Sequence, residues 1–560
     1  MIDFRLYRLC FLPALLAVIV AMFSLEGAPD ALEPVTPPST FDGDRAAAVA
    51  RQIATTAPDR TAGSDADAAI ADLVVNRFED IPSGAVSEQR FTASDDGEDV
   101  SLRNVLLTLP GDADETIVIV AARDVAHGPG AASSAAATAI LVELANAFRV
   151  SHEKTFVLAS ISGSTAGGAG VRALIDGLPE RDAISAVIVI SQPGSIERKP
   201  PFVVGTSTGR QSTSVQLERT AERAVEVQAV EPSREDGAFT QLARLAIPSG
   251  LGDQAPLIAD GIAAIAISSA GERPLSSEAD QLDDLAPKSV DEFGRAVQST
   301  VAALDVAVAE PAHGPAAHLE LGDNLVPGWA LAALALALIL PAAVAAVDAC
   351  ARAGRQSLGL GPALAWAAAR SLPFVGALAT LYLLAIIGDV PRPGFPFDPG
   401  LYGLGPRAAI AFVIMALVAG ASAWLLHRRG VSARRAPESA VCGLGAIAAG
   451  ACAVLWLLNP YLALLAAPLA HLWLLVGEAT PARRAFAVLA CALACVPLLA
   501  AAAAVAGALD LGADAPWIFS LMVADGQIGL LTMLALCFLA GVVAGVVALA
   551  LRRLGNPEIG

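Results

Sequence analysis

The chain has 560 residues, of which 55% are hydrophobic and 16% charged, with a formal net charge of −19 and a mean hydropathy of +0.60. This composition excludes an ordinary soluble protein, so part of the chain must lie in a membrane. Residues 26–325 contain 45 of the 55 acidic residues but only 21 of the 36 basic ones, which argues against nucleic acid as a partner of this acidic, water-soluble part.

The positions of the cysteines limit the chemistry of the soluble part, and the number of arginines indicates the kind of organism that the chain comes from. All seven cysteines and all six tryptophans lie outside residues 26–325. The soluble part therefore has no thiol for a disulfide or a cysteine metal site, and packing alone must stabilise it. Arginine outnumbers lysine 33 to 3, a bias typical of a GC-rich bacterial coding sequence.

The first element along the chain is an apolar run from Leu9 to Leu25, preceded by Arg5 and Arg8. Residues 26–29 offer no small-x-small cleavage site, so we expect residues 1–25 to be a retained membrane anchor, followed by a Pro-rich linker. Seven further apolar runs are long enough to cross a bilayer, which makes eight spans in all. These runs lie near residues 326–347, 371–388, 408–427, 439–458, 461–477, 485–508 and 528–551.

Arginine clusters predict the orientation of these spans, because short basic loops stay in the cytoplasm. The clusters are Arg5/Arg8, Arg352/Arg355/Arg370, Arg428/Arg429/Arg434/Arg435, Arg483/Arg484 and Arg552/Arg553. Eight alternating spans place all of them on one side, and leave only Arg392 and Arg407 as basic exceptions on the other. We therefore expect a multi-pass protein of the bacterial cytoplasmic (inner) membrane with both termini in the cytoplasm and residues 26–325 extracytoplasmic.

Short apolar runs alternate with helical patterns in the soluble part. This alternation predicts an α/β domain with a mixed, largely parallel sheet covered by helices on both faces. Because sites in such sheets lie at the carboxyl ends of strands, we expect the chemistry in the loops after residues 122, 161, 190 and 268. The expected strands are residues 105–109, 116–122, 155–161, 186–190 and 263–268, and the clearest helices are 135–148 and 291–306.

The order of segments in the soluble part resembles the zinc aminopeptidases of metallopeptidase family 28. The resemblance covers nearly all of residues 45–306, and it implies their zinc-aminopeptidase-like fold between two linkers, 26–44 and 307–325, with a seven-span domain at 326–560. The whole architecture is similar to the GPI-transamidase attachment subunit of eukaryotes. The segments are PDRTAGSDAD (58–67), RNVLLTLPG (103–111), IVIVAARD (117–124), GPGAASSAAATAILVELANAF (128–148), TFVLASISGSTAGGAGVRAL (155–174), GDQAPLIADGIAAIAI (252–267) and SSEADQLDDL (276–285).

The resemblance also implies where two zinc ions would bind, through a His, a bridging Asp, a Glu-Glu pair, a further Asp and a late His. A one-residue shift of the alignment would bring Asp124 in as a ligand. Neutral hydroxyls are weak zinc ligands and a guanidinium repels a dication, so we expect no zinc and no other cofactor. The positions that match the family's ligands are Arg123, Ser133, Ser164, Thr165, Ser191 and Ser276.

These substitutions lead to an expected function. The leading hypothesis is a catalytically inactive, peptidase-like membrane protein that binds a peptide, a lipid headgroup or a partner subunit outside the cytoplasm. Arg123 would anchor an anionic peptide or lipid ligand in the former active site, and the alternative is an internal ion pair with Asp124 or Asp253. An active membrane-bound family-28 aminopeptidase that uses zinc is the second hypothesis, and a transporter is the third. His471, inside the sixth predicted span, favours a hydrogen bond between helices over a proton relay.

Overall fold

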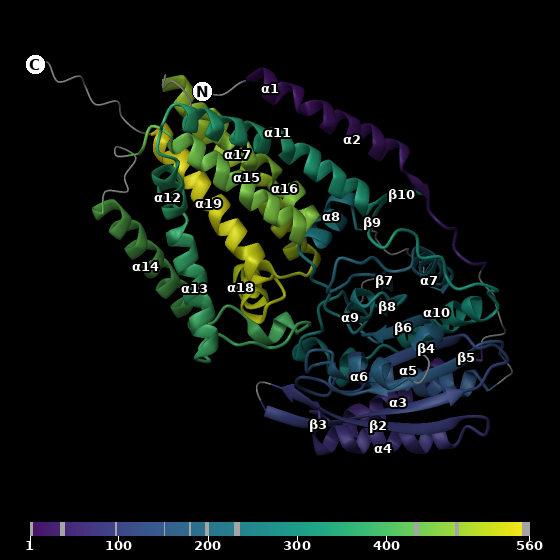
Figure 1. Ribbon diagram of the computed structural model, residues 1–560. Helices are drawn as coiled ribbons and strands as arrows, with labels where there is room; N and C mark the ends of the chain where they lie inside the picture. Colours follow the sequence, from purple (N-terminus) through teal and green to yellow (C-terminus); the bar gives the residue numbers. More distant parts are fainter. Residues whose placement is uncertain are drawn as a thin grey trace, which may run out of the picture.

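The computed structural model describes residues 4–33, 40–95, 98–149, 152–178, 181–195, 201–228, 236–429, 436–476 and 481–551. These residues form an α/β domain and a bundle of apolar helices, and the domain lies against one end of the bundle (Figure 1). Of the arginine clusters, Arg434, Arg435, Arg552 and Arg553 lie outside the described residues, as do residues 34–39 of the first linker.

A seven-stranded sheet forms the centre of the α/β domain, in the order β2-β3-β5-β4-β6-β8-β7. The four strands β5, β4, β6 and β8 are parallel, whereas β2, β3 and β7 join the edges in antiparallel fashion. The strands are β2 (Ala85–Asp95), β3 (Glu98–Leu109), β4 (Thr116–Ala122), β5 (Thr155–Ile161), β6 (Ile184–Ser191), β7 (Phe202–Val204) and β8 (Ala264–Ser268).

All five strands expected from apolar runs are confirmed, and the sheet is mixed as expected. The expectation of a largely parallel sheet is wrong at both edges, because β2 and β7 were not predicted and β3 runs antiparallel to both of its neighbours. Strand β2 is mostly polar, with Ser87, Glu88, Gln89 and Arg90 in succession, and β7 has only three residues. Neither carries the continuous apolar run that marks a strand buried on both faces.

Helices cover both faces of the sheet and complete two hydrophobic cores. Alternate strand residues such as Ile117 and Ile119 pack with α3, α4, α5, α7 and α10, while Val118 and Val120 pack with α6 and α9 on the other face. Period-two alternation of this kind is what a fully covered sheet requires. The helices are α3 (Gly43–Thr56), α4 (Asp65–Glu79), α5 (Ala136–Ala147), α6 (Ala169–Gly177), α7 (Val215–Gln228), α9 (Gln254–Ala259) and α10 (Pro287–Asp305).

Five helices in the described part of the chain are long and apolar enough to cross a membrane, and a sixth span is possible if one bent pair counts as one. That pair, α12 (Leu360–Ala369) and α13 (Leu372–Ile386), bends by 48°. Two of the eight predicted spans correspond to shorter apolar helices, Tyr7–Phe23 and Pro460–Leu475, so the count of eight stays a prediction. The five long helices are α11 (Gly328–Arg355), α14 (Pro406–Arg428), α15 (Ala440–Leu458), the apolar part Ala485–Ala508 of α17 (Pro481–Ala508), and α19 (Leu530–Ala550).

The N-terminal helices α1 (Phe4–Leu9) and α2 (Phe11–Phe23) run along α11 (Figure 1). His471, which follows α16 (Pro460–Ala470), joins them to the bundle: its Nε2 lies 2.9 Å from the Leu338 carbonyl oxygen and its Nδ1 lies 2.9 Å from the Tyr7 hydroxyl. A carbonyl only accepts, so Nε2 carries the hydrogen and Nδ1 accepts from Tyr7. Both ring nitrogens of His471 therefore have interhelical partners, in line with the expected hydrogen bond.

The two predicted linkers contribute to one small sheet. Strand β1 (Glu26–Gly27) pairs with β10 (Asn324–Pro327), which in turn pairs with β9 (His318–Leu321), all antiparallel. Strand β10 leads directly into α11. The described parts of both linkers are thus held together where the chain enters the bundle.

The domain is docked on the bundle through hydrogen bonds as well as apolar contacts. Helix α8 (Ala238–Ala246) packs against α16 and α17. The Asn459 amide donates to the Ala246 carbonyl at 3.0 Å, and the Gln527 amide donates to the carbonyls of Thr208 at 2.7 Å and Pro248 at 2.9 Å. The domain therefore has a fixed orientation relative to the helix ends that face it.

Candidate functional site

A cleft of about 370 Å³ opens at the carboxyl ends of the central strands. Ala122 at the end of β4 and Ser191 at the end of β6 lie at its floor, and the loops after β5 and β8 form its sides. These are the loops in which chemistry was expected, because in a parallel sheet all strand ends of one sense meet at the same edge.

Five of the six residues predicted for the site line this cleft. Each of them carries a neutral hydroxyl group, and they come from four separate loops or strand ends. The fold therefore brings these five residues together at one cleft. These residues are Ser133, Ser164, Thr165, Ser191 and Ser276.

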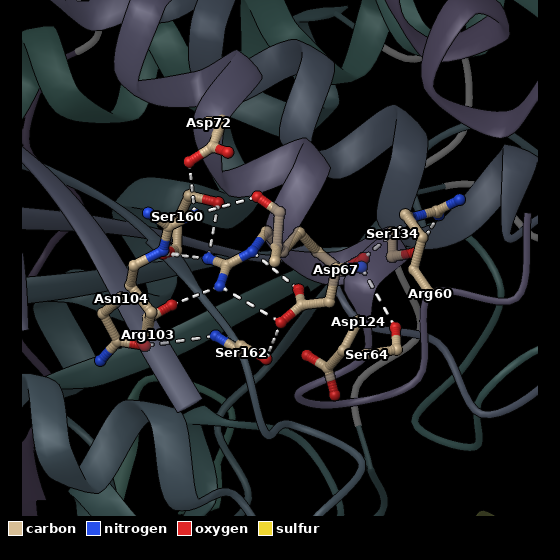
Figure 2. A network of polar contacts seen from close by, with 12 residues as sticks. Arg60, Ser64, Asp67, Asp72, Arg103, Asn104, Asp124, Ser134, Ser160 and Ser162 are labelled. Atoms are coloured by element: carbon tan, nitrogen blue, oxygen red, sulfur yellow. Dashed lines mark hydrogen bonds and ion pairs between the residues drawn. The ribbon is translucent and has the colours of Figure 1, made fainter. Parts of the chain in front are cut away.

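The sixth residue, Arg123, is not in the cleft, and the expectation that it anchors a ligand there is not supported by its position. Its side chain has no exposed surface, and its Nε forms an ion pair with Oδ1 of Asp67 at 2.8 Å. Its Nη1 donates to the Ser160 carbonyl at 2.9 Å and its Nη2 to the Arg103 carbonyl. Figure 2 shows this network, in which Ser162 also donates to Asp67 at 2.7 Å.

Arg123 therefore ties α4 to strands β3 and β5. The internal ion pair was the expected alternative, but the partner is Asp67 and not Asp124 or Asp253. Successive side chains of an extended segment point to opposite sides. Ala122 and Asp124 line the cleft, so the side chain of Arg123 between them points away from it. Burial raises the pKa of the Asp67 carboxyl in spite of the attraction to Arg123.

A second buried arginine, Arg60, holds the loop after β4 in place. Its guanidinium donates to the carbonyls of Ala57 at 2.7 Å, Pro129 at 2.9 Å and Arg123 at 3.1 Å, and to the Ser134 hydroxyl at 2.8 Å. Burial lowers the pKa of Arg60 to about 10, so the side chain stays protonated at neutral pH. The segment PDRTAGSDAD thus acts as a structural support of the cleft.

Two carboxyl groups lie in the cleft on either side of Ser164. Asp124 accepts hydrogen bonds from the Ser164 and Thr165 amides at 3.3 and 2.9 Å, and from the Thr165 hydroxyl at 2.7 Å. The Ser164 hydroxyl donates to Asp253 at 2.8 Å. Burial is the main cause that raises the pKa of Asp253 to about 7, and the nearby Asp124 raises it further.

Asp280 occupies the third side of the cleft and organises the start of a helix. Its Oδ1 accepts from the amides of Ala132 at 2.7 Å and Ser133 at 3.0 Å, and its Oδ2 accepts from the Ser133 hydroxyl. These amides belong to the first turn of the helical segment η1 (Ala131–Ala135), which continues into α5. Asp280 therefore supplies acceptors for the N–H donors that a helix start leaves unsatisfied.

The charge of the cleft is predominantly acidic. Five carboxyl groups line it, whereas the cationic or titratable basic groups in its lining are Arg273 and His127. Glu272 is neutralised by an ion pair with Arg244, and Asp253, with its pKa of about 7, is only partly ionised at neutral pH. The remaining carboxyl groups still outnumber the single arginine. The five carboxyl groups are those of Asp124, Asp253, Glu272, Asp280 and Asp398.

A segment of the helix bundle covers the outer side of the cleft. Pro396, Phe397 and Asp398, between α13 and α14, line it together with Gly400 and Leu401. The cleft is thus bounded by the domain on one side and by the bundle on the other.

Close backbone contacts hold this covering segment against the domain. The Arg172 guanidinium of α6 donates to the Phe395 carbonyl at 3.1 Å. Gly167, at φ +66°, approaches Gly394 so closely that a β carbon there would lie 3.2 Å from the Gly394 oxygen. A residue larger than glycine at position 167 would be both strained and crowded.

The donor set of the cleft does not fit the two zinc ions that the resemblance implies. The hydroxyls of Ser133 and Ser164 donate to Asp280 and Asp253, and both oxygens of Asp124 already accept hydrogen bonds. Across the described ranges, no group of three or more His, Cys, Asp or Glu side chains is arranged to hold a metal ion. A co-catalytic pair needs several anionic or imidazole ligands around each ion.

Sequence reasoning did not assign a role to three features of the cleft. Asp124 and Asp253 appeared only as an alternative ligand or as ion-pair partners of Arg123, and the covering segment near Asp398 was assigned only to a loop outside the membrane. The signal for Asp124 was its position two residues after the end of β4, on the same side as Ala122. Nothing in the sequence links Asp398 to the cleft.

The mixed sheet, the helices on both faces and the cleft at the strand ends define a zinc-aminopeptidase-like α/β fold. Residues 104–301 match the family model described as Peptidase family M28, so this stretch is a peptidase M28 domain.

Several solved structures are similar to about half of the chain. A glutaminyl cyclase from an Acidobacteriales bacterium has 18% identity and a TM-score of 0.39, with 50% of this chain and 99% of that chain covered. BSAP, a zinc aminopeptidase from Bacillus subtilis, has 13% identity and a TM-score of 0.39 with coverages of 49% and 98%. An aminopeptidase from Aneurinibacillus sp. strain AM-1 has 14% identity and a TM-score of 0.37 with coverages of 49% and 97%. A comparison with curated proteins finds no match.

Proposed function

We propose that this protein is a membrane-bound, catalytically inactive peptidase whose M28 domain uses its cleft to bind a ligand. The observation that carries the proposal is the donor set: the hydroxyls of Ser133, Ser164 and Thr165, which the resemblance matches to metal-ligand positions, donate to carboxylates inside the protein. Such hydrogen bonds stabilise a closed polar network and leave little coordination capacity for a dication.

The charge of the cleft favours a ligand with a positively charged amine. Asp124, Asp253 and Asp398 line the cleft and form no ion pair with another residue of the described chain. An anionic ligand anchored by Arg123 is disfavoured, because that side chain is buried and paired with Asp67. A peptide amino terminus or an amine headgroup has the complementary charge.

The protein is further proposed to lie in the cytoplasmic membrane of a bacterium with the M28 domain outside. The predicted outer loops at Asn459, Asp510 and Gln527 all contact the domain, which supports a common side for them. Arginines at the opposite helix ends, such as Arg355 and Arg428, supply the positive charge of a cytoplasmic side.

The second candidate is an active membrane-bound metallo-aminopeptidase. It is favoured by the presence of two carboxyl groups, Asp124 and Asp253, on facing sides of the cleft. The two candidates differ in what the full-length protein should bind.

The test uses the full-length protein purified in detergent without chelator. Metal analysis should find far less than one zinc per chain, and aminoacyl reporter substrates should not be cleaved. A peptide with a free amino terminus should bind more tightly than its acetylated form, and Asp253→Asn should weaken this preference. Asp260→Asn is the matched control, because Asp260 is an exposed carboxyl just beyond α9.

Stoichiometric zinc together with chelator-sensitive hydrolysis would establish the second candidate in place of the first. Equal binding of the free and acetylated peptides would remove the argument for an amine ligand.

A further inference from the structure

A second cavity lies on the other side of the segment that covers the cleft. It has a volume of about 910 Å³ and is located where α13 ends, α14 begins and α18 (Ala515–Asp525) packs alongside. Val390, Leu401 and Trp517 contribute apolar walls. Leu401 lines both this cavity and the cleft, so the two are separated by one short stretch of chain.

Two arginines provide the charge of this cavity. Arg392 and Arg407 line it, and no acidic side chain does. Neither arginine forms an ion pair within the described ranges, and the one hydrogen bond of Arg392 goes from Nε to the Ala385 carbonyl at 3.3 Å. The positive charges are therefore uncompensated by the protein.

The first turn of α14 adds to the positive potential. Arg407 is the second residue of this 23-residue helix, which starts at Pro406. The amide groups of a helix start carry partial positive charge, so the field of the helix and the two guanidinium groups point to the same class of ligand, an anion.

The exposed apolar surface of α14 indicates that the ligand also has an apolar part. This helix is the least buried of the long apolar helices, and Ile410, Val413 and Leu417 are 59%, 58% and 66% exposed. Figure 1 shows α14 at the outer edge of the bundle, beside α13. A molecule in the cavity therefore has a polar end at the arginines and an apolar path along α14 toward the lipid chains.

We propose that this cavity binds the phosphate headgroup of an anionic lipid from the leaflet that faces the M28 domain. Arginine recognises phosphate oxygens through paired N–H donors, and a buried aromatic such as Trp517 suits the boundary between headgroups and chains. The bound lipid would lie against Arg392 and Leu401, and would thus support the covering segment from the side opposite the cleft.

The test measures lipids retained by the full-length protein in nanodiscs that contain phosphatidylglycerol and phosphatidylcholine. After transfer to detergent, native mass spectrometry should show retained phosphatidylglycerol in preference to phosphatidylcholine. Arg392→Gln and Arg407→Gln should each weaken retention roughly tenfold, and the double variant should abolish the preference. Both side chains are exposed, so the fold should not change.

Arg428→Gln is the matched control. Arg428 is at the other end of the same helix, is exposed, and lies 3.8 Å over the ring of Trp424, but it lines no part of this cavity. Its substitution removes the same charge and should leave retention unchanged.

Inorganic phosphate in large excess separates a lipid from a free phosphate as the ligand. The lipid should remain bound, because its chains contribute apolar contacts that phosphate lacks. Full displacement by phosphate would overturn the lipid assignment. Undiminished retention in the double variant, or an equal loss in Arg428→Gln, would overturn the assignment of the two arginines.

Discussion

Arg123 and Asp67 form an ion pair that is almost completely buried, so the loss of either partner would leave an unpaired charge inside the M28 domain. We expect Arg123→Met to destabilise the domain strongly without a direct effect on the cleft. The guanidinium has no exposed surface, and Asp67 is only 4% exposed. Methionine fills much of the same space but leaves the carboxylate without its cation.

The expected magnitude follows from what the substitution leaves behind. Asp67 would keep the Ser162 hydroxyl as a donor, while the carbonyls of Ser160 and Arg103 would lose theirs. Removing one partner of a buried pair typically costs about 3–5 kcal/mol. The double variant Arg123→Met/Asp67→Asn removes the stranded charge and should recover a large part of the loss.

Amide hydrogen exchange of the full-length protein measures this loss locally. The domain contains no tryptophan, so fluorescence would report on the bundle instead. Amides of β4 and β5 should exchange roughly one hundred to a few thousand times faster in Arg123→Met. The control is Arg90→Met: Arg90 pairs with Glu88 at 2.7 Å but is 70% exposed, and such pairs contribute about 0–1 kcal/mol.

The reasoning is refuted if Arg123→Met exchanges as slowly as Arg90→Met. It is also refuted if the double variant is no more stable than the single one, since the loss would then not come from an unpaired carboxylate.

Three further predictions address the cleft, the orientation and the N-terminal helices. Burial raises the pKa of Asp253 from its ordinary value of 3.8 to about 7, so this carboxyl lowers the stability of the domain as the pH rises from about 4 to about 7. The difference corresponds to about 4 kcal/mol at most, and Asp253→Asn should remove this part of the pH dependence in hydrogen exchange. A reporter fused after Arg428 should be cytoplasmic and one at Asp514 external, and the reverse pattern would contradict the charge argument. Tyr7→Phe removes the hydroxyl that donates to His471 and should lower the stability of the bundle by about 1 kcal/mol. Tryptophan fluorescence during thermal unfolding in detergent measures this loss. An unchanged midpoint would show that the hydrogen bond is dispensable.

The described contacts also suggest why the domain and the bundle occur in one chain. The covering segment from 391 to 402 has one side in the cleft and the other in the second cavity. It is fixed to the bundle by Asp525, which accepts from the Phe395 amide, and to the domain by Arg172. The covering segment is therefore in contact with both the cleft and the second cavity, and a movement of the segment would alter both.

Local sequence patterns determined much of the fold. Continuous apolar runs predicted β4 and β5 to the residue. The five hydroxyl residues that line one cleft were named from the family resemblance and not from a local pattern. The strands are predictable because strand burial depends on a few neighbouring residues. The edge strands β2 and β7 lack such runs, so the sequence did not reveal them.

Tertiary structure alone decided the environment of individual charges. Arg123 and Asp124 are adjacent in the sequence, yet one enters the core to meet Asp67 and the other enters the cleft. A shift of one residue at a strand end exchanges the two sides, and the apolar pattern does not define it that finely. Asp398 lines the cleft although it is more than a hundred residues further along the chain than Asp280, because the whole domain docks on the bundle. No local sequence pattern encodes a contact between the domain and the bundle.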